Sequence, residues 1–252
     1  MKRLVPLALA MLLVTSPTLA EKDARTAFLA GETKDCPGCD LSGQSLTYRD
    51  LSEADLTGAN LSRARFHRAV LRRAKLVGAN LSDANLNLAD LRFADLSGAD
   101  LSGALLYEVN AGAATLAKAN LAGAKLQHAQ LARADMAGAV LREVDATEAS
   151  LAGADLTGAD LTGIYAPGSD FRQTKLNGAM LSDGLFLEAD FTSAKLTGAT
   201  VERADLREAK LTKAVFADAV ISGSRFARAW TQGADFTNVD VASASGLTVS
   251  KP

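Results

Sequence analysis

The residues best suited to chemistry are two cysteines three positions apart, Cys36 and Cys39, separated by Pro37 and Gly38. A pair with this spacing can exchange a disulfide in a redox enzyme, or supply two of the four ligands of a zinc ion. A redox motif needs a βαβ context that is absent here, and two cysteines cannot complete a zinc site in one chain. We therefore interpret the pair as a structural cap on the first repeat, with a disulfide as the open alternative.

The other candidates for catalysis or metal binding are two histidines and a large set of carboxylates. His67 and His128 stand about three coils apart on the predicted architecture, and neither has a set of partners that would make it a general acid or base. Asp or Asn occupies 20 of 41 equivalent positions along the chain. Residues 20 apart at these positions alternate in charge or replace carboxylates by amides, which limits repulsion between solvent-exposed side chains and argues against paired carboxylates or calcium ligands. The sequence therefore predicts no catalytic site, no metal site and no cofactor.

A period of five residues organises the chain that carries these side chains. Among the 41 positions from Leu41 to Val241 whose numbers end in 1 or 6, 37 carry a large apolar residue. Two residues before each of them, 30 of 41 positions are Ala. We call the apolar residue i, so that alanine is i−2 and the outward positions are i−1, i+1 and i+2.

This period excludes an ordinary helix or strand. Five residues advance a helix by about 500°, so the leucines would circle its surface, and in a strand an odd spacing alternates them between faces. A chain that turns a corner every five residues instead directs each leucine to a common axis. Glycine at i+2 recurs every 20 residues, as in Gly58, Gly78 and Gly98, which predicts four repeats per coil and about ten coils.

Runs such as Ala54-Asp55-Leu56-Thr57-Gly58 resemble the A-(D/N)-L-x-x consensus of the pentapeptide-repeat family over residues 36 to about 241. The resemblance implies an all-β fold, a right-handed quadrilateral β-helix. It implies little about function, because that family is largely uncharacterised. Its best understood members are dimeric, DNA-mimicking proteins that protect DNA gyrase from fluoroquinolones.

The two ends depart from the repeat. A basic start and an apolar stretch from Leu4 to Val14 precede small residues ending at Ala20, which predicts a cleaved signal peptide over residues 1–20 and export to the periplasm or outside the cell. The stretch is about half the length that spans a bilayer, so we expect no stable membrane span after cleavage. Residues 21–35 predict a short helical cap, 36–241 the β-helix and 242–252 a loose tail.

Two sets of outward residues break the repeat pattern. A basic set on the second coil contains no acid and predicts either a solvated girdle or an anion-binding patch: Arg63, Arg65, His67, Arg68, Arg72, Arg73 and Lys75. An apolar set falls in the columns of one side and predicts an interface, with drift from the consensus as the alternative: Leu88, Leu105, Tyr107, Tyr165, Leu185 and Leu187.

These features favour an exported, non-enzymatic scaffold that binds a protein partner or itself through its outer faces. The alternative is a DNA-mimicking, gyrase-binding protein, which predicts strongly acidic sides; a purely structural spacer or an exported enzyme ranks last. Without the signal peptide the chain has 25 basic and 29 acidic residues. This net charge of −4 is too small to imply nucleic acid as a partner.

Overall fold

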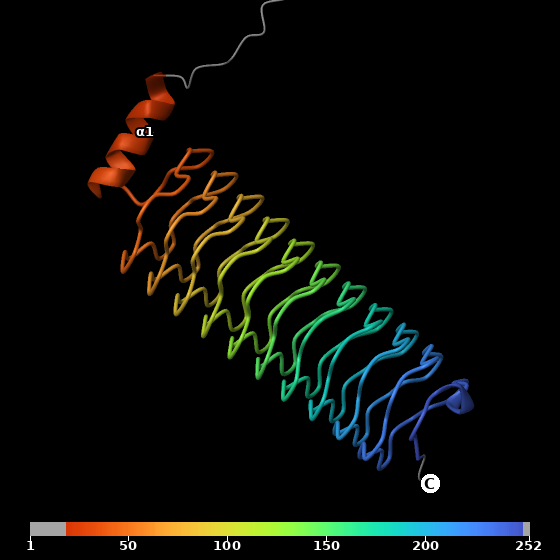
Figure 1. Cartoon of the computed structure of the whole chain (residues 1–252). Coiled ribbons are helices and arrows are strands. Elements are labelled where there is room, and N and C mark those ends of the chain that lie inside the picture. The colour runs from red at the N-terminus through yellow and green to blue at the C-terminus, as the bar shows by residue number, and fades with distance from the viewer. Residues whose placement is uncertain (1–18, 249–252) are drawn as a thin grey trace, which may run out of the picture.

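The chain folds as a right-handed quadrilateral β-helix preceded by one helix, as expected (Figure 1). The structure, a computed structural model, describes residues 19–248. Helix α1 (Leu19–Ala30) lies at one end of the stack of coils, and the 3-10 helix η1 (Val241–Ser243) lies at the other. The predicted signal peptide lies outside the described residues except for Leu19 and Ala20, which begin α1. Neither helix has the length and apolar character needed to cross a membrane.

Parallel β-bridges join each coil to the next at the i−1 positions, always between residues 20 apart, from Asp40↔Asn60 to Arg225↔Ser245. The bridges are single residues, because the chain turns a corner before a longer strand can form. The backbone is nevertheless paired between coils: the N–H of Leu41 donates to the carbonyl of Asn60 at 2.8 Å. This pairing satisfies polar groups that would otherwise face an apolar interior.

We number the four sides by the residues at their centres. Side 1 is centred on Leu41 and the residues at multiples of 20 after it; side 2 on Leu46, side 3 on Leu51 and side 4 on Leu56, in the same way. The outward residues of a side are the i−1, i+1 and i+2 residues of its repeats. Sides 1 and 3 are opposite each other, as are sides 2 and 4.

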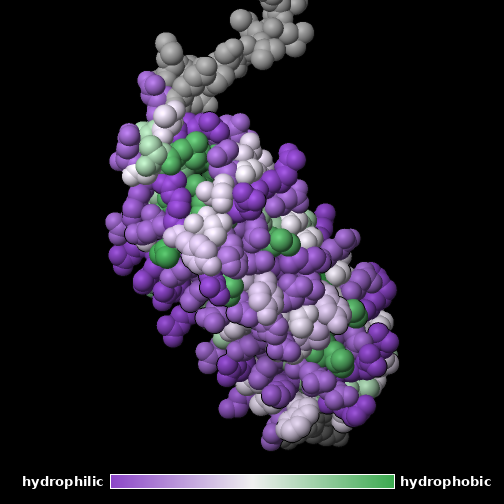
Figure 2. All heavy atoms as spheres, turned by 60° about the vertical axis from the view of Figure 1, so that its left-hand side comes forward, coloured by the Kyte–Doolittle hydropathy of each residue, from purple (hydrophilic) through white to green (hydrophobic). Residues whose placement is uncertain are grey.

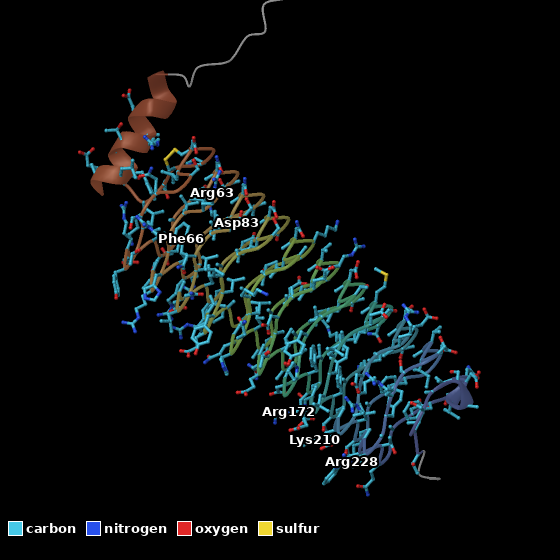
Figure 3. The ribbon with its side chains drawn as sticks, viewed as in Figure 1. Arg63, Phe66, Asp83, Arg172, Lys210 and Arg228 are labelled. Carbon is cyan, nitrogen blue, oxygen red and sulfur yellow. A yellow bond between two sulfur atoms is a disulfide. The ribbon has the colours of Figure 1, made fainter. Side chains whose placement is uncertain are left out.

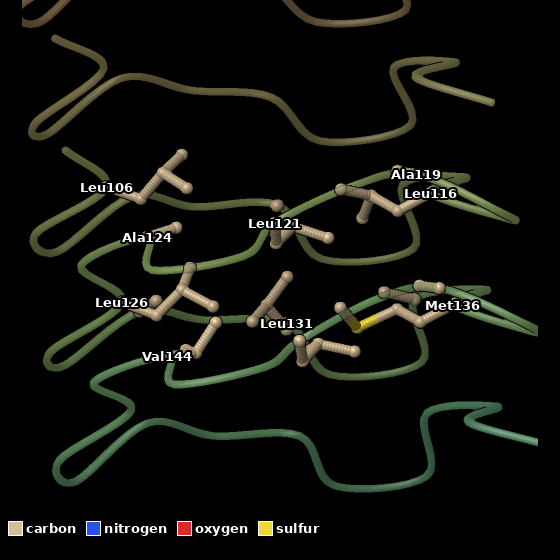
Figure 4. Packing of buried hydrophobic residues seen from close by; sticks show 14 of the residues in the cluster. Leu106, Leu116, Ala119, Leu121, Ala124, Leu126, Leu131, Met136 and Val144 are labelled. Carbon is tan, nitrogen blue, oxygen red and sulfur yellow. The ribbon is translucent and has the colours of Figure 1, made fainter. Parts of the chain in front are cut away.

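The interior is a continuous stack of the i and i−2 side chains, nearly all of them buried (Figure 4). Leu106 lies above Leu126 in the next coil, and Leu116 above Met136, so each apolar side chain packs on its equivalents in adjacent coils. Full burial of one such side chain stabilises the fold by about 1.5–3 kcal/mol. The small alanine at i−2 leaves room at each corner for its larger neighbour.

Phenylalanines replace leucines in the seventh and eighth coils and pack as a cluster. The rings of Phe171 and Phe191 stack with centroids 4.7 Å apart, and Phe186 meets them edge-on at 5.8 and 5.4 Å. Gly184 takes the i−2 position beside them, where a Cβ would lie 2.4 Å from the ring of Phe186. Glycine therefore replaces alanine because the ring occupies the corner.

Three i−2 positions carry a buried hydroxyl instead of alanine. Ser169 donates to the carbonyl of Ala146 at 2.6 Å, and Thr174 donates to that of Leu151 at 3.0 Å. Ser224 makes the same kind of bond to a carbonyl of the coil before it. In residues 19–248 no buried side-chain nitrogen or oxygen lacks a hydrogen-bond partner.

Every corner is a tight turn whose i+2 residue has a positive φ, as the glycines predict. The N–H of Ala54 donates back to the carbonyl of Leu51 at 3.1 Å, and the same bond closes most of the other turns. The positive φ is found at all 41 i+2 positions from Gly38 to Asn238, 25 of which are not glycine. The glycine columns thus reveal the 20-residue period, but all four corners turn in the same way.

Helix α1 caps the first coil, as predicted for residues 21–35, and ends earlier, at Ala30. Gly31, with φ of 81°, ends the helix: its N–H donates to the carbonyl of Phe28, and the N–H of Glu32 to that of Ala27. The side chain of Phe28 is fully buried, whereas Leu29 is exposed.

The first coil is adapted to receive the helix. Arg49 stands at an i−2 position, where alanine is usual, because that position faces α1 instead of a preceding coil. Its guanidinium lies 4.7 Å from the centroid of the Phe28 ring and donates to the carbonyl of Phe28 at 2.8 Å. From the helix, Arg25 donates to the carbonyl of Asp40 at 2.7 Å. These contacts cover the open edge of the first coil.

Cys36 and Cys39 are joined by a disulfide inside this first coil, with their Cα atoms 5.4 Å apart. Cys36 takes the inward i position and Cys39 the i−2 corner, and both are buried. The bond closes the turn over Pro37 and Gly38, next to the N-terminal end of the stack.

Replacing Cys39 with alanine, the usual residue at i−2, should lower the free energy of unfolding by about 2 kcal/mol, because a short covalent loop is opened. Hydrogen exchange should show the loss of protection in the first coils and none in the last, since coils contact only their neighbours. Wild-type protein under reducing conditions should match the variant. Equal loss of protection at both ends would contradict this prediction.

The prediction of a loose tail from residue 242 is wrong for residues 242–248. Ser245 pairs with Arg225 as the next coil would, and the N–H of Gly223 donates to the carbonyl of Ser243 at 2.9 Å. Thr231 donates through its hydroxyl to the carbonyl of Thr248. The period of five ends at Val241, but backbone pairing continues because it does not depend on side-chain type.

Candidate interaction surfaces

The predicted basic set forms a girdle around the rod. Its seven residues are spread over all four sides: Arg63 on side 1, Arg65, His67 and Arg68 on side 2, Arg72 and Arg73 on side 3, and Lys75 on side 4. Some are paired with carboxylates of adjacent coils, Arg72 with Asp90 at 3.7 Å and Arg73 with Glu53 at 3.9 Å. The fold therefore does not gather this set into one patch.

The predicted apolar set lies on side 2, where it forms two groups. In the first group the N–H of Leu88 donates to the carbonyl of Tyr107 at 2.9 Å, and Leu105 lies beside them. In the second, Tyr165 bridges Leu185 in the next coil. The other member of the second group is Leu187. Leu105, Tyr107, Tyr165 and Leu185 are 40–48% exposed, and the two remaining residues are half-buried.

Two coils bearing polar residues separate these two groups, because the bridges between Leu105 and Tyr165 pass through Lys125 and Asp145. Other exposed apolar residues, which the sequence did not predict as part of an interface, are spread over all four sides: Met180 and Val220 on side 1, Tyr48 on side 2, Phe93 and Trp230 on side 3, and Val77 on side 4. Assigning every outward residue to its column would have found them. On the face shown in Figure 2, hydrophobic residues lie in small separate patches within a hydrophilic surface.

The two histidines contact aromatic and acidic side chains. The ring of His67 meets that of Tyr48 edge-on at 6.1 Å. His128 meets Tyr107 edge-on at 5.5 Å, and its Nδ1 lies 3.4 Å from a carboxylate oxygen of Glu148. These are surface contacts between neighbouring coils, and they do not form the nucleophile and base arrangement of a hydrolase.

The aspartates at i−1 accept hydrogen bonds within their own turns, which explains their frequency. Asp50 accepts from Ser52 at 3.0 Å, and this hydrogen bonding is the main reason that its pKa is lowered to about 2. The side chain of Asp205 is 5% exposed and accepts from Arg207 at 2.8 Å and from Arg225 at 3.0 Å. The bond from Arg207 contributes most to holding the pKa of Asp205 below its usual value. Within residues 19–248 no group of three or more potential metal ligands is found.

Charge is distributed unequally among the sides. Side 3 carries seven basic and five acidic outward residues, namely Arg72, Arg73, Arg92, Arg133, Arg172, Lys210 and Lys213 against Asp50, Glu53, Asp90, Asp170 and Asp190. Side 1 carries three basic and eight acidic ones, namely Arg63, Arg142 and Arg203 against Asp40, Asp83, Asp100, Glu143, Asp160, Asp183, Glu202 and Asp240. Figure 3 shows Arg172 and Lys210 along one edge of the rod and Arg63 and Asp83 along the opposite edge.

The turns of side 3 also form a groove of about 610 Å³, which the sequence did not predict. Small residues form its floor, Arg92 and Phe93 close one end, and Arg172 and Gln173 close the other. The floor consists of Gly112, Ala113, Ala132, Ala152 and Gly153, with Arg133 beside it. On the other side of Phe93 is a smaller hollow of about 270 Å³, lined also by Ser52, Glu53, Arg72 and Arg73.

Comparison with known families finds one whose model, described as pentapeptide repeats, matches overlapping segments that together span residues 35–238. Comparison with curated proteins finds no match.

Several solved structures are similar to this chain. HetL, a pentapeptide repeat protein of the cyanobacterium Nostoc involved in regulating heterocyst differentiation, is 31% identical over 85% of this chain and 94% of its own, with a TM-score of 0.58. A structure of QnrB1, a plasmid-mediated fluoroquinolone resistance protein, is 19% identical over 72% of this chain and 88% of its own, with a TM-score of 0.45. A protein of the Arabidopsis thaliana thylakoid lumen is 31% identical over 40% of this chain and 66% of its own, with a TM-score of 0.22.

Proposed function

Because the chain belongs to the pentapeptide-repeat family, we propose that it is an exported scaffold that acts by binding a protein partner through its outer surface. Its interior is filled by apolar side chains at close packing, so recognition has to use the outward residues. The family and this packing favour an interaction protein over an enzyme.

The observation that carries the proposal is the pair of apolar groups on side 2. Leu105 and Tyr107 in one group, and Tyr165 and Leu185 in the other, expose 40–48% of their surface. Large apolar and aromatic side chains that share one face are typical anchors of protein interfaces. Acidic residues follow the corner of the same side and supply a polar rim: Glu108, Glu148, Glu188 and Glu208.

Export is supported by two features. The N-terminal 20 residues have the basic start, apolar stretch and small terminal residues of a signal peptide. The disulfide between Cys36 and Cys39 accords with an oxidising compartment such as the periplasm or the extracellular space.

A DNA-mimicking, gyrase-directed protein is the alternative that we do not favour. It would need sides with a strong negative charge, whereas side 3 carries more basic than acidic residues. The similarity to QnrB1, at 19% identity, concerns the fold alone.

We expect Leu105→Asp and Leu185→Asp each to reduce the recovery of the partner about tenfold or more, because each places a charge among apolar anchors. The measurement is cross-linking of full-length wild-type and variant proteins in cells, followed by purification from the exported fraction and mass spectrometry. Val220→Asp is the matched control, since Val220 is an exposed apolar i−1 residue on side 1. Its recovery should equal that of the wild type.

Two results would overturn the proposal. If wild type and both side 2 variants recover the same protein in equal amount, side 2 is not the interface. If the mature protein fractionates with the cytoplasm and binds purified gyrase, both the export and the choice of partner class are wrong.

A further inference from the structure

We infer that the groove on side 3 binds an extended acidic polypeptide segment with a carboxylate at every third residue. This inference names a partner chemistry for the scaffold proposed above and rests on that proposal, although it uses a different side. Its basis is a hollow floored by small residues, three arginines at regular spacing and a net positive charge found on no other side.

The hollow exists because five turn residues in three successive coils are glycine or alanine. At the same columns the flanking coils carry large side chains, Arg92 and Phe93 before the hollow and Arg172 and Gln173 after it. A Cβ on Gly112 would lie 3.5 Å from the Asn110 amide oxygen and 4.0 Å from Arg92 Cγ. Glycine and alanine extend no further than a Cβ, so the floor lies below the side chains of the flanking coils and leaves room for another backbone.

Two of the arginines are held in place by carboxylates on the same side. Arg92 donates to both oxygens of Asp90 at 2.8 and 2.5 Å, and Arg172 donates to those of Asp170 at 2.8 and 2.6 Å. Each bond pair uses two of the five N–H donors of a guanidinium, so three remain for a ligand. For Arg133 no ion pair is found among residues 19–248, so its charge is not balanced by a direct partner.

The spacing of these arginines matches an extended chain. Arg92 and Arg133 are two coils apart, as are Arg133 and Arg172, and each interval is about 9.6 Å at the usual distance between paired strands. Third neighbours in an extended polypeptide are about 10 Å apart. Arg92 and Arg172 share the i+1 column while Arg133 is in the i+2 column. Residues one, four and seven of a strand alternate between its two faces in the same way.

The charges nearby favour such a segment over a uniform polyanion. Asp135 and Asp155 lie on side 4, two positions along the chain from the i+2 column of the groove. A nucleic acid or an anionic polysaccharide would bring continuous negative charge close to these aspartates. A peptide with neutral residues between its carboxylates meets the arginines and avoids that repulsion.

The test uses the mature protein and a fluorescein-labelled peptide of seven residues, with glutamate at positions one, four and seven and threonine or valine elsewhere. Fluorescence anisotropy should show binding that weakens with salt, and a peptide with glutamine in place of glutamate should bind about tenfold or more weakly. Ala132→Phe, which fills the groove, and Arg133→Glu should each weaken binding by a similar factor.

Two matched controls test whether a bulky or an acidic residue weakens peptide binding only when it lies in the groove. Ala137→Phe makes the same change, and Lys118→Glu the same reversal of charge, at the same repeat positions on side 4, and both variants should bind the peptide as the wild type does. Circular dichroism should show all four variants folded. Equal binding of the glutamine peptide, or equal weakening by the side 4 variants, would overturn the inference.

Two further measurements show whether the groove binds a different ligand and whether a negative result concerns this inference or the proposed function. If heparin or single-stranded DNA binds with the same sensitivity to Ala132→Phe and the peptide does not, the groove takes a polyanion and the inference is wrong. Leu105→Asp and Leu185→Asp should leave peptide binding unchanged. If the side 2 variants lose the cellular partner but wild type never binds the peptide, the inference fails and the proposed function stands.

Discussion

Replacing Phe191 with alanine is expected to lower the free energy of unfolding by about 3–5 kcal/mol. The ring is fully buried, stacks on Phe171 at 4.7 Å and meets Phe186 edge-on at 5.4 Å. Its removal leaves a cavity that the coil backbone cannot close, because each coil is hydrogen-bonded to the coils on both sides. Urea denaturation followed by circular dichroism measures the change.

Phe93 provides the matched control for this prediction. It is the same residue type on the outside of the rod, with 54% of its surface exposed. Phe93→Ala should change the free energy of unfolding by no more than about 0.5 kcal/mol, because surface substitutions rarely do more. Equal losses in the two variants would mean that the inward and outward positions have been assigned wrongly.

Replacing Phe28 with aspartate is expected to cost about 3–5 kcal/mol and to cause self-association. The ring is fully buried between α1 and the first coil, and the guanidinium of Arg49 lies 4.7 Å from its centroid. A charge at this position would detach α1 from the coil and expose an edge with unpaired backbone groups. Terminal caps are what keep solenoids soluble. Urea denaturation and light scattering measure the two effects.

Leu29 provides the matched control for the cap. It is the next residue in α1, and 37% of its surface is exposed. Leu29→Asp should leave both the stability and the scattering close to those of the wild type. If Phe28→Asp remained monomeric and as stable as the wild type, α1 would not be the cap that the structure shows.

The sequence alone determined the interior of this protein. Inward positions accept few side chains, so Leu and Phe at i, Ala at i−2 and glycine at i+2 repeat often enough to reveal the coil and its four sides. The same register assigns the apolar set to the columns of side 2, while its role as an interface stays a prediction. The departures at Gly184 and Arg49 could not be interpreted in this way, because each responds to a neighbour that only the structure supplies: the ring of Phe186 and helix α1.

Only the tertiary structure decided what the surface offers. Arg92, Arg133 and Arg172 are about 40 residues apart in the chain and come to lie along one side because coiling brings every fourth repeat onto that side. Likewise, the seven basic residues of the second coil look like a cluster in the sequence but are carried around all four sides by its corners. Outward side chains are weakly constrained by packing, so their types do not reveal their arrangement. The groove on side 3 depends on several coils together, and a single repeat contains no sign of it.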